Sequence, residues 1–223
     1  MHQTDQEKDN QFKVWDLSLR VFHFILIILI IGSYISAKLD MLNIHQYFGV
    51  SILGLIFFRI LWGFVGSYYS KFESFNISIK GALTQFSKKN QNKSIRTPLG
   101  SFSTLTFIIV LIGLSISGLF SSDDVLYDAP LAHLASNYVY LWTDIHNLLH
   151  FFLYFLVGTH ILAILYYQII KKHKIIQRMI DGYTRINQKS VRSINEKSSK
   201  GILLIFIFIL TPILILSYSN KTC

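Results

Sequence analysis

Five long apolar runs separated by polar segments dominate the chain. Each run is long enough to cross a bilayer as an α-helix, which takes about 20 mostly apolar residues. The pattern predicts an all-α integral membrane protein, in which a four-helix transmembrane bundle is followed by a fifth, C-terminal transmembrane helix. The predicted transmembrane helices cover residues 21–38, 46–66, 102–120, 143–170 and 201–218.

The polar segments divide the chain further. We expect an N-terminal segment over 1–20, a transmembrane core over 21–185, a basic linker over 186–200 and then the fifth helix.

The composition, 52% hydrophobic and 15% aromatic, is too apolar for a soluble domain of this size. The single cysteine, Cys223, excludes a disulfide or an iron–sulfur site built from this chain alone.

The net charge of +9 comes from Lys and Arg residues that lie between the apolar runs. They gather in the N-terminal segment and in the 67–101 and 171–200 loops, whereas the 121–144 loop has four aspartates and no Lys or Arg. Membrane topology explains this pattern better than nucleic-acid binding, and we expect no nucleic-acid partner. By the positive-inside rule, the N-terminus and both basic loops are cytoplasmic.

Four histidines fall at two depths of the predicted bundle. His23 and His160 lie near the cytoplasmic surface, and His45 and His146 lie near the outer surface. His146 and His160 are 14 residues apart, which on a helix is a rise of about 21 Å with an offset of about 40°, so both share one face. Two imidazoles from different helices at each level are what two bis-histidine b-type haems need.

Other interpretations of these histidines stay open. A lone membrane histidine more often makes an interhelical hydrogen bond, and a set of them can relay protons in a transporter. His146 and His150 have the spacing of a zinc-binding pair, but no third and fourth ligand follows at a fixed spacing. His150 is about 80° around the helix from His160, so we expect it to pack or hydrogen-bond beside the outer haem.

Three further residues are candidates for contacts with haem. Gly49, one turn after His45, leaves room for a flat macrocycle, or else serves helix packing. Arg59 could pair with a propionate of the inner haem, since guanidinium matches carboxylate, or could extend to the surface from the helix end. Arg20, one turn before His23, has the same two interpretations.

Several segments resemble the bacterial di-haem cytochrome b family, which includes bacterial cytochrome b-561 and the cytochrome b subunits of nickel–iron hydrogenases. The resemblance spans residues 13–185 and is carried, in order, by VWDLSLRVFHF, NIHQYFGVSILGLIFFRILWGFVGS, DAPLAHLAS, DIHNLLHFFLYFLVGTHILAILYY and MIDGYTR. It implies a four-helix core with two non-covalent b-type haems. The residues that match the family's axial ligands are His23, His45, His146 and His160. The sequence departs from the family at Phe24 and Asn147, where Trp and Glu are common.

The resemblance implies a multi-pass protein of the bacterial cytoplasmic (inner) membrane. We expect an electron-transfer subunit of an oxidoreductase in a respiratory chain. It would carry electrons between the quinone pool and a cytochrome c, a hydrogenase or another dehydrogenase subunit, with lipid around it. Homodimerisation stays open. The alternatives are a stand-alone quinol-oxidising cytochrome b-561 that passes electrons to a small acceptor such as superoxide, a small proton-coupled transporter, and a structural anchor.

Overall fold

The computed structural model describes residues 11–84, 97–123, 127–185, 194 and 198–222. Within these ranges, five helices are long and apolar enough to cross a membrane, which confirms the predicted all-α membrane fold. The chain is therefore a multi-pass membrane protein. The five long helices are α2 (Leu17–Lys38), α3 (Leu42–Val65), α5 (Pro98–Leu119), α6 (Val139–Leu165) and α8 (Ser198–Thr222).

Local signals set where these helices begin. The Asp16 carboxylate accepts a hydrogen bond from the Leu19 amide at 2.7 Å, so Asp16 caps the N-terminus of α2. Helix α5 begins at Pro98 and not at residue 102, because the Thr97 hydroxyl accepts from the Gly100 amide and proline suits the first helical position. Helix α6 continues into one turn of π-helix, η4 (Tyr166–Ile170).

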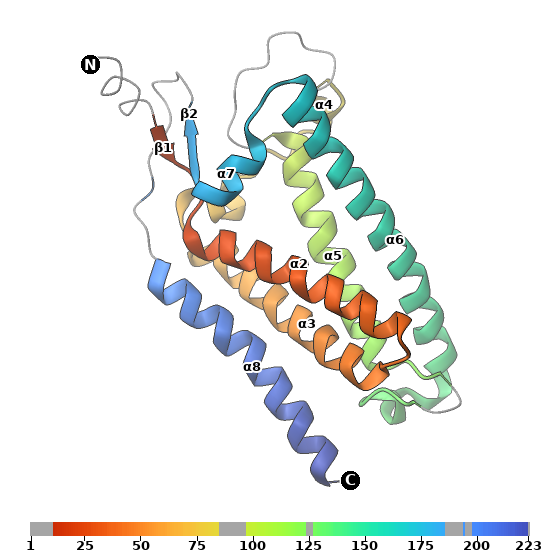
Figure 1. The fold of residues 1–223 in the computed structure, drawn as a ribbon. Helices are drawn as coiled ribbons and strands as arrows, with labels where there is room; N and C mark the ends of the chain where they lie inside the picture. Colours follow the sequence, from red (N-terminus) through yellow and green to blue (C-terminus); the bar gives the residue numbers. More distant parts are fainter. Residues whose placement is uncertain (1–10, 85–96, 124–126, 186–193, 195–197, 223) are drawn as a thin grey trace, which may run out of the picture.

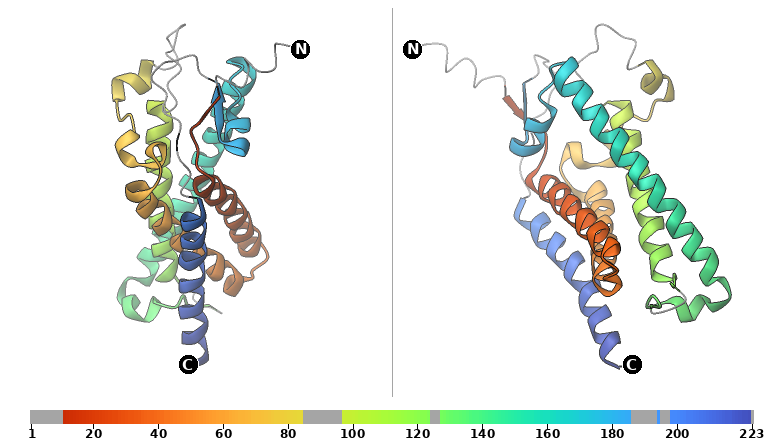
Figure 2. Two further views of the ribbon diagram at one scale, coloured as in Figure 1. Left: turned by 90° about the vertical axis from the view of Figure 1, so that its left-hand side faces the viewer. Right: turned by 45° about the vertical axis from the view of Figure 1, so that its right-hand side comes forward.

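The long helices form two antiparallel hairpins, α2 with α3 and α5 with α6, and α3 packs against α5 (Figure 1). Helix α8 packs along α3 and the first part of α2, on the side away from α6 (Figure 2). A Cβ atom at Gly54 would lie 1.9 Å from the Phe208 carbonyl oxygen, so only glycine allows α8 this close to α3. Helices α2 and α6 are not among the pairs that pack extensively.

The interior of the bundle is apolar and closely packed. Its most buried large side chains come from α3, α5 and α8, and they include Leu55, Phe58, Leu111 and Ile205. Inside a membrane, such packing is held by van der Waals contact, because lipid is as apolar as the core. These contacts fix α3 and α5 as the rigid centre against which α2 and α6 are placed.

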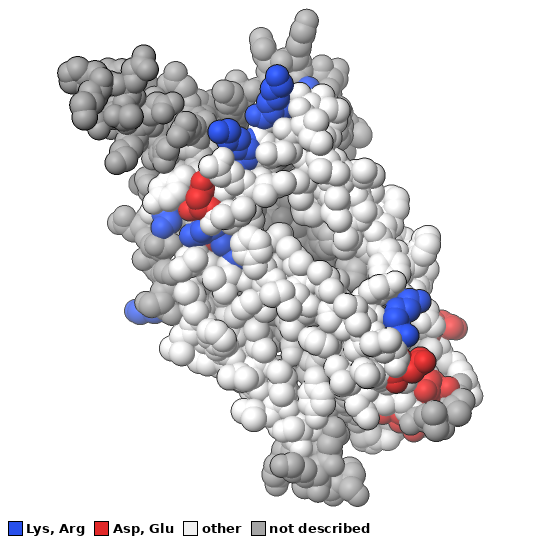
Figure 3. Space-filling view, viewed as in Figure 1, with Lys and Arg blue, Asp and Glu red and all other residues white. Residues whose placement is uncertain are grey.

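The two ends of the bundle differ in charge (Figure 3). One end, called the basic end here, holds the start of α2, the end of α3 and α6, and four short elements: α7 (Ile175–Asp181), α4 (Ile79–Thr84), η1 (Tyr68–Ser70) and η2 (Phe72–Ser74). The acidic end holds the α2–α3 turn and residues 120–123 and 127–138, including η3 (Ala132–Tyr138). Helix α4 lies in the basic loop between α3 and α5.

A two-stranded sheet closes the basic end. Strand β1 (Gln11–Lys13) pairs antiparallel with β2 (Tyr183–Arg185), and Phe12 is opposite Thr184. The Gly182 carbonyl accepts from the amides of Val14 and Trp15 at 2.9 and 3.2 Å. The sheet therefore joins the start of α2 to the segment that follows α6. Helices α2 and α6 do not pack extensively along each other, so the sheet is a direct link between them.

Candidate functional site

His45 and His146 face each other at the acidic end. His45 lies in the first turn of α3, and His146 lies two turns into α6. Their ring centroids are 6.1 Å apart, and the ring planes are nearly perpendicular at 86°. The structure therefore brings together the two histidines that the sequence assigns to one depth.

Both imidazoles are held in the same way by backbone carbonyls. His45 Nδ1 donates to the Ser33 carbonyl oxygen at 2.9 Å, and His146 Nδ1 donates to the Leu114 carbonyl oxygen at 2.9 Å. A carbonyl can only accept, so the hydrogen of each neutral ring is on Nδ1. The Nε2 atom of each ring therefore carries no hydrogen and has a lone pair with which it can bind a metal.

His23 and His160 lie at the basic end, on α2 and α6. The two rings are close enough to interact electrostatically. The His160 ring packs edge-on against Phe107 of α5, with centroids 5.5 Å apart. His23 Nδ1 is buried and has no hydrogen-bond partner among the described residues. A buried ring nitrogen without a partner is unusual in a folded protein, and it distinguishes His23 from the two acidic-end histidines.

The family model for prokaryotic cytochrome b561 matches residues 14–182. The chain belongs to this family. It is a membrane b-type cytochrome that takes part in electron transfer, and the family implies binding of b-type haem. The resemblance inferred from the sequence is confirmed. No curated protein and no solved structure matches the chain.

The acidic-end pair of this cytochrome fits a haem iron. An iron atom between two imidazoles puts their centroids about 6 Å apart, since a metal–nitrogen bond to histidine is about 2 Å and the nitrogen is about 1 Å from its ring centre. The observed 6.1 Å agrees with this sum. A Cβ atom at Gly49 would meet nothing within 4 Å, so there is open space next to this residue, one helical turn after His45. Gly158 also has open space, but it is about 200° around α6 from His160 and does not face that histidine.

Sequence reasoning missed the residues of α5 that hold His146. Leu114 supplies the carbonyl acceptor, and the Ser117 hydroxyl lies 3.3 Å from His146 Nδ1. A Cβ atom at Gly118 would lie 2.9 Å from His146 Cε1, so a larger residue there would push the imidazole away from α5. Small residues such as Ser117 and Gly118 are typical of close helix packing, and they are the sequence signal for this contact.

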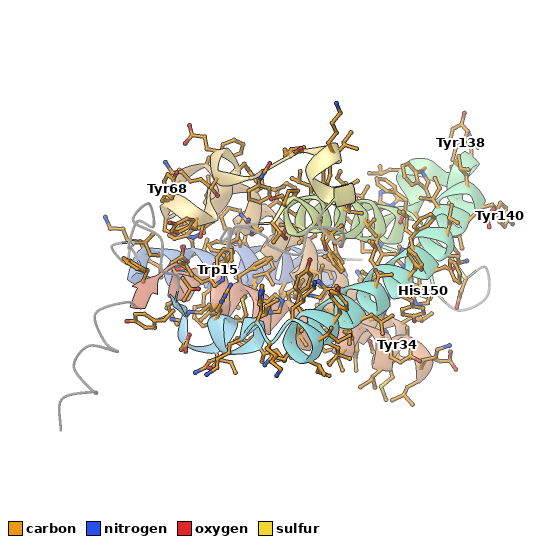
Figure 4. All side chains as sticks on the ribbon, turned by 90° about the horizontal axis from the view of Figure 1, so that it is seen from above. Trp15, Tyr34, Tyr68, Tyr138, Tyr140 and His150 are labelled. Atoms are coloured by element: carbon orange, nitrogen blue, oxygen red, sulfur yellow. The ribbon has the colours of Figure 1, made fainter. Side chains whose placement is uncertain are left out.

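His150 is not part of either pair. Its Nε2 hydrogen-bonds to the Tyr154 hydroxyl one turn along α6, and the Tyr154 ring meets the Tyr34 ring of α2 at 5.7 Å. Figure 4 shows His150 and Tyr34 at the same end of the bundle, away from Trp15. The described residues include no group of three or more His, Cys, Asp or Glu placed to hold a metal ion, so His146 and His150 have no third zinc ligand.

Arg59 is enclosed at the basic end and does not extend to the surface. Its side chain is 2% exposed and donates to the Ser70 carbonyl oxygen at 3.3 Å. The guanidinium carbon lies 5.2 Å from the ring centre of Phe72 and 6.0 Å from that of Phe75. It also interacts electrostatically with Asp16. These contacts already occupy Arg59 within the protein.

Arg20 links α2 to α7. One of its terminal nitrogens donates to the Ile180 carbonyl oxygen, and its Nε is buried without a hydrogen-bond partner among the described residues. Arg20 is one turn from His23, whose Nδ1 is also unpaired. The basic end therefore presents two buried donors without acceptors on neighbouring turns of one helix.

The loop of the acidic end is tied to α3 beside His45. The Tyr127 hydroxyl donates to Gln46 Oε1 at 2.6 Å. Burial, and then the nearby Asp123, raises the pKa of Tyr127 to about 12, so its hydroxyl keeps its proton at neutral pH. His133 of the same loop is exposed in η3.

Proposed function

We propose that the chain binds two b-type haems and carries electrons across the membrane between the quinone pool and a redox partner protein. His45 and His146 would be the axial ligands of one haem, and His23 and His160 those of the other. The observation that carries the proposal is the acidic-end pair, whose ring separation suits an intervening iron and whose Nδ1 atoms are both bound to carbonyls. Because each Nδ1 is bound to a carbonyl, the Nε2 of each ring is the nitrogen that remains available to a metal.

The basic-end pair supports a second haem on different grounds. His23 and His160 lie on α2 and α6, two neighbouring long helices that do not pack extensively along each other, so a cofactor between them would not have to displace a close helix contact. Arg20, with its unpaired Nε, is the better candidate to bind a haem propionate, because Arg59 is already engaged by Ser70 and two aromatic rings. An arginine N–H to a carboxylate is a strong, charge-assisted hydrogen bond.

Bound haem supplies a reversible one-electron carrier, and the chain supplies its position and surroundings. Helix α6 contributes one ligand to each site, from residues separated by about 21 Å of helical rise. The two sites would therefore lie toward opposite membrane surfaces, which is the arrangement needed for electrons to cross. The Ser33 and Leu114 carbonyls would hold the acidic-end ligands in one tautomer and one orientation.

The charge difference between the two ends supports a direction in the membrane. Lys and Arg gather at the basic end, so by the positive-inside rule this end would face the cytoplasm of a bacterial inner membrane. The partner protein, a cytochrome c, hydrogenase or other dehydrogenase subunit, would then dock at one of the two surfaces, and quinone would reach the bundle from the lipid.

Vesicles containing the purified chain test the proposal. With ferricyanide enclosed and a soluble hydroquinone added outside, we expect the haem spectrum to be reduced and the enclosed ferricyanide to be consumed. His23→Ala and His146→Ala should each stop this consumption, while His133→Ala, a change at an exposed loop histidine, should not. Colourless protein would refute the proposal and favour the transporter, and unchanged consumption in both ligand variants would refute the assigned ligands.

A further inference from the structure

The two histidine pairs differ in what binds their Nδ1 atoms. At the acidic end, both Nδ1 atoms donate to backbone carbonyls at 2.9 Å. At the basic end, within the described part of the chain, His23 Nδ1 is buried without a partner and His160 makes no hydrogen bond. The four candidate ligands are chemically identical, so this contrast is a built-in difference between the two sites.

A hydrogen bond donated by Nδ1 changes how strongly Nε2 of the same ring donates electrons to a bound metal. When Nδ1–H donates to a carbonyl, electron density on the ring rises and Nε2 becomes a more basic ligand. A more basic ligand stabilises ferric iron more than ferrous iron, because the ferric ion carries the larger positive charge. Second-shell hydrogen bonds of this kind are one of the protein's means of setting haem potential. The contrast at Nδ1 therefore lowers the potential at the acidic end relative to the basic end.

The charges of the two ends act in the same direction. Asp40, Asp123, Asp128 and Asp144 lie at the acidic end, together with Lys38. The basic end is rich in Lys and Arg (Figure 3), and one of these residues, Arg59, is buried. Positive charge favours adding an electron to a nearby iron, and negative charge opposes it, most strongly where the surroundings exclude water. Hydrogen bonding and charge are independent observations, and both make the acidic-end iron the harder one to reduce.

We propose that the site of His45 and His146 is the lower-potential haem site, that the Ser33 and Leu114 carbonyls set its potential, and that Gly118 is a positioning residue that lets His146 reach Leu114. The proposal rests on the proposed function, since it needs a haem at each end. Its consequence is a downhill direction for electrons from the acidic end to the basic end.

Redox titration of the purified full-length chain, followed by the haem absorbance, tests the order of the two sites. His23→Ala should leave the acidic-end haem, and His45→Ala should leave the basic-end haem. We expect the wave of His23→Ala to lie at the lower potential. The reverse order, or two coincident waves, would overturn the proposal. A wild-type chain with fewer than two haems would show that the proposed function itself has failed, before any potential is compared.

Two glycines of α5 provide a matched pair for the role of Gly118. An added Cβ would meet His146 Cε1 at Gly118 and Leu149 Cδ1 at Gly113, both at 2.9 Å. Both substitutions therefore press on α6 equally closely, but only Gly118→Ala presses on a ligand. We expect Gly118→Ala to raise the lower-potential wave and leave the other in place, and Gly113→Ala to leave both unchanged. Unmoved waves in Gly118→Ala, or an equal shift in Gly113→Ala, would contradict the role of Gly118.

Discussion

Asp16 and Trp62 are joined by a buried hydrogen bond, from the indole Nε1 to Asp16 Oδ2 at 3.2 Å. Asp16 is fully buried and also accepts from the hydroxyls of Ser67 and Ser70. One carboxylate thus connects the start of α2 to the end of α3 and to the turn that follows it. This connection sets the position of the helix that carries His23.

Replacing Asp16 with alanine should strongly destabilise the protein. The change leaves buried donors of Trp62, Ser67 and Ser70 without an acceptor and removes the anion near Arg59, at a cost of about 3–5 kcal/mol. Thermal unfolding in detergent, followed by loss of helical circular dichroism, measures the effect. Glu73→Ala, at an exposed position of η2, is the control and should stay within about 0.5 kcal/mol of wild type. Equal melting temperatures for the two variants would show that the Asp16 network contributes little.

Removing either acidic-end ligand should cost one haem and leave the other. His45→Ala and His146→Ala each remove one of the two facing rings, and the haem content of the purified variants, measured as the pyridine haemochrome, reports the loss. His150→Ala is the matched control, because His150 bonds to Tyr154 on its own helix. We expect it to retain both haems. If His150→Ala lost a haem and His146→Ala retained both, His150 would be the ligand and His146 would not.

Side-chain size at Gly49 should decide whether the acidic-end haem binds. Gly49→Ala should be tolerated, since its Cβ meets nothing within 4 Å. Gly49→Leu should fill the open space and lower the haem content, while helical circular dichroism stays unchanged. Full haem occupancy in Gly49→Leu would show that the cofactor does not use this space.

The sheet at the basic end should depend on Gly182. This residue has φ of 84°, and an added Cβ would lie 2.7 Å from the Trp15 carbonyl oxygen. Gly182→Ala should therefore destabilise the local structure by about 1–3 kcal/mol. We expect faster trypsin cleavage after Lys13 than in wild type. Gly100→Ala, in the first turn of α5, is the control and should leave this cleavage rate unchanged.

The fold could be predicted from the sequence because lipid-spanning helices are long and uniformly apolar. The pairing of His45 with His146 followed from depth alone, since helix length and loop charge fix the level of each histidine. The sheet of β1 and β2 could not be predicted, because its two strands are three residues each and lie far apart in the chain. Strands that short have no detectable periodicity.

The missed parts of the site share one physical cause. The acceptors for His45 and His146 are backbone carbonyls, and every residue has a carbonyl, so Ser33 and Leu114 have no signature in the sequence. The enclosure of Arg59 was likewise hidden, because its aromatic neighbours Phe72 and Phe75 follow the helix in a separate turn. Contacts of this kind depend on how the chain folds back on itself.

The ratio of haem to protein in the purified wild-type chain tests the central claim most directly. Pyridine haemochrome analysis gives the amount of b-type haem, and amino-acid analysis gives the amount of protein. Two histidine pairs at opposite ends of the bundle predict two b-type haems per chain. A ratio of one would mean that only one pair binds iron, and a ratio of zero would contradict the account as a whole.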